Sequence, residues 1–330
     1  MTDDEFTAYH DLADETGDHR WAFGTGFTDP LEGIDTSVPD GVNAAALAAY
    51  CLMLGDDALI YSHRLQQWMT RLPELEEETA IANIALDLLG QARMLLARAG
   101  RAEGAVLAES TGLAESTGLA EGTGLAEGTG LAEGTGLAEG TGRSEDQLAF
   151  FRLEKDFRNV RLAEHADADF AQLAGRLLIF STWRLALLGR LHDSRDPVLA
   201  AIAAKGAKEL AYHRDYAAQW VIRLGDGTEL SRIRMQAALD TLWPLVDELF
   251  RADTVAGDLP GVAADPAGLR AEFDDVLSTV LAAATLDHPG AAPMAEVAGK
   301  CGRDGVHTEA LGYVLAELQS VARAHPDAAW

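Results

Sequence analysis

The side chains best suited to chemistry in this sequence are its nine histidines and 53 acidic residues, because imidazole and carboxylate groups are common metal ligands. A di-iron site inside a helical bundle needs a Glu on each of two helices and a Glu-x-x-His motif on each of two others, since residues three apart share a helix face. No histidine here follows a Glu by three positions. His307 has Asp304 there, but the flanking glycines indicate a loop. The sequence therefore lacks the motif that this chemistry requires.

Charge and composition exclude several other functions. Acidic residues outnumber Lys and Arg by 53 to 26, and the formal net charge of −27 argues against binding to nucleic acid or to an anionic membrane. We expect no membrane span and no signal peptide, because no apolar stretch approaches about 20 residues and the chain starts with MTDDEF. The two cysteines, Cys51 and Cys301, are far apart, as is typical of the reducing cytoplasm. No P-loop, dinucleotide motif or nucleophilic triad is present.

Helices are the elements that must position any site. Prolines, threonines and acidic residues at their starts and basic residues at their ends mark them, and Gly100 reads as a stop signal. No alternating strand pattern occurs, so we predict an all-α bundle with antiparallel neighbours. The predicted helices span residues 43–69, 74–99, 169–193, 197–224, 231–251, 266–284 and 308–323.

Two segments differ from this helical pattern. Residues 1–42 hold eleven acidic residues and one base, Arg20, and we predict a mostly disordered tail in which the aromatics of residues 21–27 either dock on a partner or stay solvated. Residues 107–142 repeat L-A-E-[SG]-T-G six times, and the glycine in each unit predicts a low-complexity surface loop rather than a helix. We expect one helical domain over residues 43–330, interrupted by this loop.

Several segments of the chain together carry a family resemblance: ANIALDLLGQAR (82–93), EDQLAFFR (145–152), SRDPVLAAIAAKGAKELAYH (194–213), RLGDGTELSRIRMQAALDTLW (223–243) and GKCGRDGVHTEALGYVLAELQ (299–319). The chain resembles the C-subunit family of the phenylacetyl-CoA epoxidases, or phenylacetate-CoA oxygenases. The resemblance covers about residues 45–105 and 143–330.

This resemblance implies a ferritin-like four-helix bundle that acts as a structural, non-catalytic subunit in the cytoplasm. Its partners would be the catalytic di-iron subunit, the other oxygenase subunits and a flavin/iron–sulfur reductase. The implied complex epoxidises the ring of phenylacetyl-CoA with oxygen and electrons from NADPH. No cofactor is implied for this chain itself, and the di-iron centre is expected in the partner.

The resemblance also implies that the metal ligands of the catalytic relative are replaced. One Glu-x-x-His becomes Leu88 and Gln91, and the other becomes Leu210 and His213, of which only the histidine is retained. A further carboxylate position falls near Ser181. Apolar residues in place of carboxylates convert a metal cage into ordinary packing.

On the first helix, the remaining carboxylate position falls near Ala58, with Asp56 or Asp57 within a turn of it.

Polar residues near these positions have two interpretations. Asp87, Gln91, Arg93 and His213 either form an interior network that replaces the metal, or Arg93 is exposed and Asp87 lies at the bundle rim. Glu209, four residues before His213, either pairs with it or faces solvent.

Two basic regions are candidate contacts. Lys300 and Arg303, in the glycine-rich loop 299–305, are expected to be exposed and to bind a partner or an anion, or to belong to an ordinary connection. A second group recurs every third residue, and it either contacts an acidic partner or CoA phosphates or forms a solvated helix face: Arg152, Lys155, Arg158 and Arg161.

The sequence is compatible with two other functions. One is an independent di-iron carboxylate oxygenase with atypical ligands, and the other is a helical adaptor unrelated to oxygenation. An iron assay separates the first from a structural subunit, and the identity of the co-purifying partner separates the second.

Overall fold

The computed structural model describes residues 33–72, 74–117, 142–252, 254–292, 294–326 and 328. Over these ranges the regular structure is helical, apart from one isolated β-bridge between Val297 and Lys300, so the predicted all-α fold is confirmed. The long helices are α1 Ala44–Gln66, α2 Leu75–Thr117, α5 Phe170–Leu191, α6 Pro197–Gly225, α7 Glu229–Leu242, α9 Arg270–Ala283 and α10 Glu309–Ala324. The short elements include α3 Glu145–Phe150, α4 Arg161–Glu164, α8 Thr254–Gly257, η3 Glu154–Asp156, η5 Asp247–Phe250 and η7 Gly302–Asp304.

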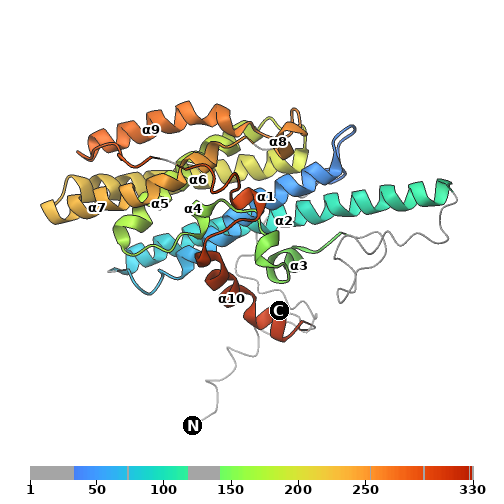
Figure 1. Cartoon of the computed structure of the whole chain (residues 1–330), viewed down its shortest axis with the longest axis horizontal. Coiled ribbons are helices and arrows are strands. Elements are labelled where there is room, and N and C mark those ends of the chain that lie inside the picture. The colour runs from blue at the N-terminus through green and yellow to red at the C-terminus, as the bar shows by residue number, and fades with distance from the viewer. Residues whose placement is uncertain are drawn as a thin grey trace, which may run out of the picture.

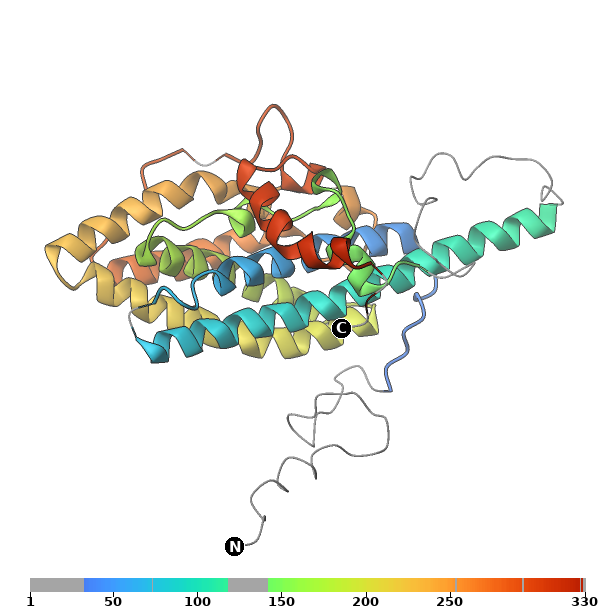
Figure 2. The same ribbon diagram turned by 90° about the horizontal axis from the view of Figure 1, so that it is seen from below.

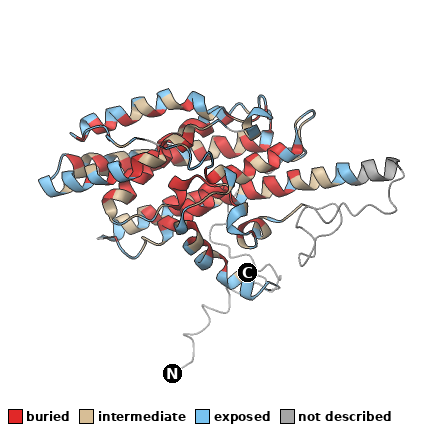
Figure 3. Ribbon diagram, viewed as in Figure 1, coloured by how far each residue is buried: buried red, intermediate tan, exposed pale blue. Residues whose placement is uncertain are grey.

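Helices α1, α2, α5 and α6 form a bundle at the centre of the molecule (Figure 1). α1 packs along α2, where the Ser62 hydroxyl donates a 2.6 Å hydrogen bond to the Ala85 carbonyl. α5 packs along α6, and the two helix pairs meet where the Tyr61 and Phe180 rings stand edge to face, 4.4 Å apart. The faces that these helices turn toward one another are buried (Figure 3), as expected of bundle helices with broad apolar faces.

Two groups of elements cover the bundle from opposite sides (Figure 1). α7 and α9 pack on α5 and α6. On the other side lie α3, η3, α4, the loop that leads to η7, and α10. We call residues 145–164 and 294–324 the outer layer. It crosses α1, so it covers one face of the central helices (Figure 2).

α2 is longer than the sequence indicates. It continues through Gly100 and through residues 107–117 of the repeat, where the prediction of a non-helical loop is wrong. Leu, Ala and Glu favour helix, and extending an existing helix past an occasional glycine costs only about 1 kcal/mol per glycine. Gly100 serves packing instead of capping, because a Cβ there would lie 2.0 Å from the Arg143 carbonyl oxygen.

The chain returns from the repeat beside α2. The Arg143 guanidinium forms an ion pair with Glu103, at 2.6 Å, and so closes the base of the insertion. Figure 2 shows the end of α2 extending beyond the other bundle helices. The remainder of the repeat, residues 118–141, lies outside the described residues.

The end of the expected tail is also ordered on the bundle. Arg98 of α2 is buried, and it donates hydrogen bonds to the carbonyls of Thr36 (2.6 Å) and Ser37 (3.1 Å) while pairing with Asp196. Ile34, Val38 and Val42 pack against the core. Residues 33–42 are therefore a docked segment rather than the disordered tail that we predicted, and residues 1–32 lie outside the described part.

Two helices, α1 and the Leu75–Ser110 part of α2, are long and apolar enough to cross a membrane by length and composition alone. In the most apolar window of α1, 83% of the residues are buried inside the protein. This is the pattern of a helix at the core of a bundle, which passes the same composition test.

Candidate functional site at the centre of the bundle

A polar cluster joins three of the four central helices. Gln91 of α2 is buried, and its Nε2 donates a 2.9 Å hydrogen bond to Oε2 of Glu209 on α6. Its Oε1 accepts a 3.0 Å hydrogen bond from Nε of Arg184 on α5. Gly206 makes room for this contact, because a Cβ there would lie 3.2 Å from the Gln91 amide. We call Gln91, Arg184 and Glu209 the central cluster.

The cation of the central cluster is the Arg184 guanidinium, which is fully buried. Nη2 donates a 3.2 Å hydrogen bond to the Leu54 carbonyl of α1, so this side chain of α5 contacts both α1 and α2. Burial lowers the pKa of Arg184 to about 10. The Asp57 carboxylate raises this pKa in part, and the charge of Arg303 lowers it. The group therefore carries a positive charge at neutral pH.

His213 forms a second, separate pair beside the central cluster. Its ring is buried, and Nε2 lies 2.9 Å from Oδ2 of Asp87, across α6 and α2. The carboxylate only accepts hydrogen bonds, so Nε2 carries the hydrogen. Nδ1 has no partner among the described atoms. Asp87 is partly exposed, which places this pair at the rim of the bundle.

The structure thus brings only part of the expected interior network together, and Arg93 and Asp87 lie as in the alternative interpretation, one exposed and the other at the rim. Gln91 belongs to the central cluster, Asp87 and His213 pair at the rim, and Glu209 contacts Gln91 rather than His213. Arg93 is not part of either group, because its exposed side chain pairs with Glu145 of α3 at 2.6 Å.

The other degenerate positions are ordinary packing. Leu88, Leu210 and Ala58 are fully buried apolar residues. Ser181 is buried, and its hydroxyl donates a 2.6 Å hydrogen bond to the Leu177 carbonyl of its own helix.

These residues do not fit a di-iron centre. An iron pair needs several carboxylates and histidines that converge, whereas here Glu209 is bonded to Gln91, His213 pairs with Asp87 at the rim, and the buried Arg184 guanidinium repels metal ions. Within the described ranges, one group of possible ligands is close enough to share an ion: Glu74, Glu76 and Glu77 at the start of α2, outside the bundle.

Buried ion pairs connect the outer layer to α1. Asp56 and Asp57 are fully buried on α1 and do not point into the bundle centre as metal ligands would. Asp56 pairs with Arg152 after α3, and Asp57 pairs with Arg303 of η7 at 2.7 Å. Both carboxylates also accept backbone hydrogen bonds from the outer layer.

Two further pairs hold the outer layer in place, one within it and one between it and η5. Glu164 of α4 faces Nδ1 of His307 at 2.8 Å, and the His307 Nε2 lies 3.0 Å from the Phe157 carbonyl. Because both ring nitrogens face acceptors, His307 carries both hydrogens. Burial alone lowers the pKa of His307, but the hydrogen bond and charge of Glu164 raise it above the usual range. Arg161 pairs with Glu248 of η5 at 2.7 Å.

The basic residues at 152–161 were expected either to contact an acidic partner or CoA phosphates or to form a solvated helix face. Neither expectation holds for most of them. Arg152 and Arg161 are buried, and these positions lie on an irregular segment rather than one helix face. Lys155 alone points fully to solvent, whereas Arg158 is only partly exposed and hydrogen bonds to the Lys155 carbonyl at 2.7 Å. The three-residue spacing therefore does not mark a basic surface.

Lys300 and Arg303 differ in the same way. Lys300 is exposed, as expected. Arg303 is not, because its guanidinium points inward to Asp57 and to the carbonyls of Met53 (3.0 Å) and Arg158 (2.7 Å). The prediction that both side chains are exposed is wrong for Arg303.

The sequence reasoning missed Arg184. The available signal is its setting, since Arg184 and Arg176 lie eight residues apart on one face of a helix that is apolar on all sides. A charge at such a place has to find a partner inside the protein.

Comparison with known proteins gives two findings. The model of a family described as "phenylacetic acid catabolic protein" matches residues 35–330. The chain is 38% identical over 286 residues to the protein of Escherichia coli (strain K12) that is named as the C component of 1,2-phenylacetyl-CoA epoxidase, one of the subunits of that enzyme. The alignment covers 86% of this chain and 99% of that protein.

Proposed function

The chain belongs to the phenylacetic acid catabolic protein family, and we propose on this premise that it is the structural subunit of a multicomponent di-iron monooxygenase that epoxidises the ring of phenylacetyl-CoA. The name of its relative is that of one subunit of a phenylacetyl-CoA epoxidase. The near-complete alignment supports the same role here.

The central cluster is the observation that supports a non-catalytic role. Arg184 places a cation where an iron-bearing bundle needs anionic ligands, and Leu88 and Leu210 fill the neighbouring positions. Oxygen activation by iron needs a carboxylate-rich site with open coordination positions. In the proposed division of labour, a partner subunit holds the iron and this chain maintains that partner in an active complex in the cytoplasm. Further oxygenase subunits and a reductase complete the assembly.

The outer layer is the surface that we assign to the partner. Of the twelve large hydrophobic side chains that are exposed among the described residues, six lie on it: Phe151, Leu153, Met294, Val297, Tyr313 and Val321. A groove of about 1150 Å³ runs between α2, α3 and α10, with Leu89, Phe151 and Val321 among its lining residues. Stable hetero-complexes bury apolar centres of this kind.

The buried ion pairs suit this surface to binding. They fix the irregular segments of the outer layer on α1 before a partner arrives, so less conformational entropy is lost on association. Lys300 belongs to the proposed surface and lies beside the exposed Val297. Arg303 does not belong to that surface, because its side chain points inward and pairs with Asp57.

Reconstitution tests the proposed function. The iron-bearing subunit is assayed for oxygen-dependent epoxidation of phenylacetyl-CoA, with its reductase, in the absence and presence of this chain. We expect turnover to require both subunits and this chain alone to give none. Full activity of the iron-bearing subunit by itself, or turnover by this chain alone, would contradict the proposal.

A further inference from the structure

The outward side of α2 carries an apolar stripe that the described parts of the chain leave exposed. Leu75 and Leu86 lie on it, with 72% and 61% of their surfaces exposed. Ala82 and Gly90 share this side of the helix, which lies at the edge of the bundle (Figure 2). A Cβ at Gly90 would have no neighbour within 4 Å, so a gap lies one turn from the exposed Leu86. Leu86 and Gly90 thus form a complementary pair, a projecting side chain and a space beside it.

The two ends of this stripe carry opposite charges. Glu74, Glu76 and Glu77 converge at the start of α2, where one carboxylate oxygen of each lies within 4.8 Å of the other two. Arg101 lies about seven turns beyond Glu76, and whole turns return a residue to the same side of a helix. Glu76 and Arg101 therefore share one side of α2, and both are exposed.

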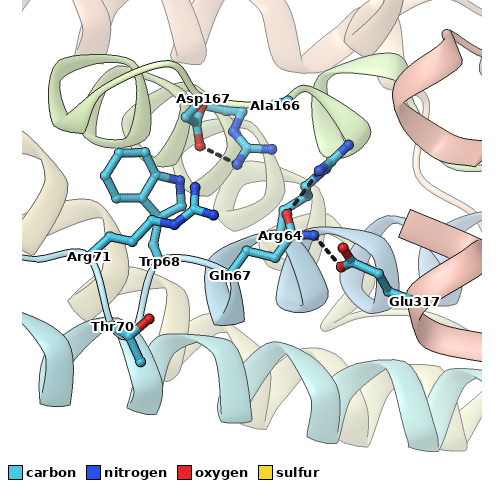
Figure 4. Close-up of a pocket in the computed structure, with 9 residues that line it drawn as sticks. Arg64, Gln67, Trp68, Thr70, Arg71, Ala166, Asp167 and Glu317 are labelled. Carbon is cyan, nitrogen blue, oxygen red and sulfur yellow. Dashed lines mark hydrogen bonds and ion pairs between the residues drawn. The ribbon is translucent and has the colours of Figure 1, made fainter. Parts of the chain in front are cut away.

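Glu76 and Arg101 form no ion pair within the described parts of the chain. Charged groups elsewhere find a partner inside the molecule, as Arg176 does with Asp167 in the polar pocket at the end of α1 (Figure 4). Three carboxylates that crowd together without a cation repel one another. This end of α2 therefore favours contact with a positively charged group.

We propose that a second copy of this chain packs antiparallel along α2, about a two-fold axis. Such an axis brings two positions face to face when their midpoint lies on it. The midpoint of Leu86 and Gly90 lies at Leu88. The midpoint of Glu76 and Arg101 lies within one residue of it, so one axis serves both pairs. Leu86 of each copy then fills the gap of the other, and each acidic end meets an arginine. A parallel copy would place like charges together instead.

The contact between the two copies is long and narrow. From Glu76 to Arg101 it spans about 40 Å, at about 1.5 Å per residue. Two helices side by side bury less than the roughly 800 Å² per partner of a standard interface, so we expect a weak dimer that dissociates in the micromolar range. The inference does not depend on the proposed function, because the outer layer contributes no residue to it.

Sedimentation equilibrium of the purified full chain, over about 1–100 μM, tests the dimer. Salt at about 150 mM screens the net charge of −27 beyond about 8 Å, so the local contacts decide the result. We expect a monomer–dimer equilibrium that Leu86→Glu weakens by at least about tenfold, because the variant brings charge into the apolar centre of the contact. The matched control is Ile233→Glu, a similarly exposed position on α7 that should leave the equilibrium unchanged.

Charge variants test the antiparallel arrangement. Arg101→Glu makes both ends of the stripe acidic, whereas Glu74→Lys combined with Glu76→Lys makes both ends basic. Each variant alone should lose the dimer, and an equimolar mixture should form a mixed dimer, because only there do opposite charges meet at both ends. A parent chain that is monomeric at every concentration overturns the proposal, as does a mixture that stays monomeric. The proposal also fails if Leu86→Glu keeps the dimer and loses only the iron-bearing subunit, which would assign the stripe to that partner.

Discussion

Nε of Arg184 donates a 3.0 Å hydrogen bond to Oε1 of Gln91, and this contact places a guanidinium cation between α5 and α2 at the centre of the bundle. Nε2 of Gln91 in turn donates a hydrogen bond to Oε2 of Glu209 on α6. The Gln91 amide, which donates one hydrogen bond and accepts another, thus links a buried cation to a carboxylate. Each member depends on the others, because an unpaired polar group in this interior is expensive.

Loss of Arg184 should therefore destabilise the protein strongly. We expect Arg184→Ala to lower the free energy of unfolding by about 3 kcal/mol or more, through a cavity and an unsatisfied Gln91. The matched control is Arg93→Ala, because Arg93 forms an exposed pair with Glu145 that is worth at most about 1 kcal/mol. Urea denaturation of both variants measures the difference. Equal effects in the two variants would contradict the role of the central cluster.

The pair between His307 and Glu164 should make stability depend on pH. The pKa of His307 is raised in the folded state, so its contribution is fully present below about 6.5, the usual unfolded value, and is lost as the pH rises through the folded value. We expect the gap in unfolding free energy between the parent and His307→Gln to be largest near pH 6 and to shrink toward pH 9.

Denaturant titrations between pH 6 and pH 9 measure this gap. His192→Gln is the control, because His192 is exposed and its loss should leave the pH profile unchanged. A gap that stays constant or widens with rising pH would show that His307 is not held in its charged form.

Negative charge introduced among the exposed side chains of the outer layer should weaken binding of the partner subunit. Val297→Asp combined with Lys300→Glu should leave the fold intact, because both side chains are exposed, and should weaken co-elution with the iron-bearing subunit. The control is Ile233→Asp, an equally exposed apolar residue on α7, which faces away from the outer layer. Size-exclusion chromatography of the co-expressed pair decides. If Ile233→Asp weakened the pairing and the double variant did not, the interface would lie on α7 instead.

Removal of four repeat units, residues 113–136, should barely change stability. The deletion leaves the α2 residues before position 113 in place, and the ion pair of Arg143 with Glu103 still closes the shortened loop. Loop-closure entropy changes by only about 1 kcal/mol for such a deletion. Thermal unfolding should show a midpoint within a few degrees of the parent. A drop of more than about ten degrees would mean that the repeat packs on the core.

The fold was largely predictable because its signals are local. Apolar periodicity, the proline at the start of α6 and the acidic first turn of α2 depend only on neighbouring residues, and both helices start where these signals place them. The helix expected over residues 231–251 instead ends at Leu242, just before Pro244. The end of α2 was missed because a glycine that normally stops a helix, Gly100, is used here for close packing against Arg143.

The site was less predictable because its partners are far apart in the sequence. Family resemblance located Gln91 and His213, and Asp87 was expected in the same network, but nothing near Gln91 in the chain reveals Arg184 as its partner. The same holds for Arg152 and Arg303, whose spacing and glycine-rich setting suggested exposure. Their partners, Asp56 and Asp57, are about 100 and 250 residues away in the chain.

The iron content of the purified chain tests the central claim most directly. The chain is produced in iron-replete cells, alone and with the iron-bearing subunit, and metal is measured by elemental analysis. We predict that the chain alone holds far less than one iron per molecule, and that the iron of the complex is accounted for by its partner. About two irons per molecule in the chain alone, with the absorption band of a di-iron centre, would contradict a structural role and require a metal site that the central cluster does not provide.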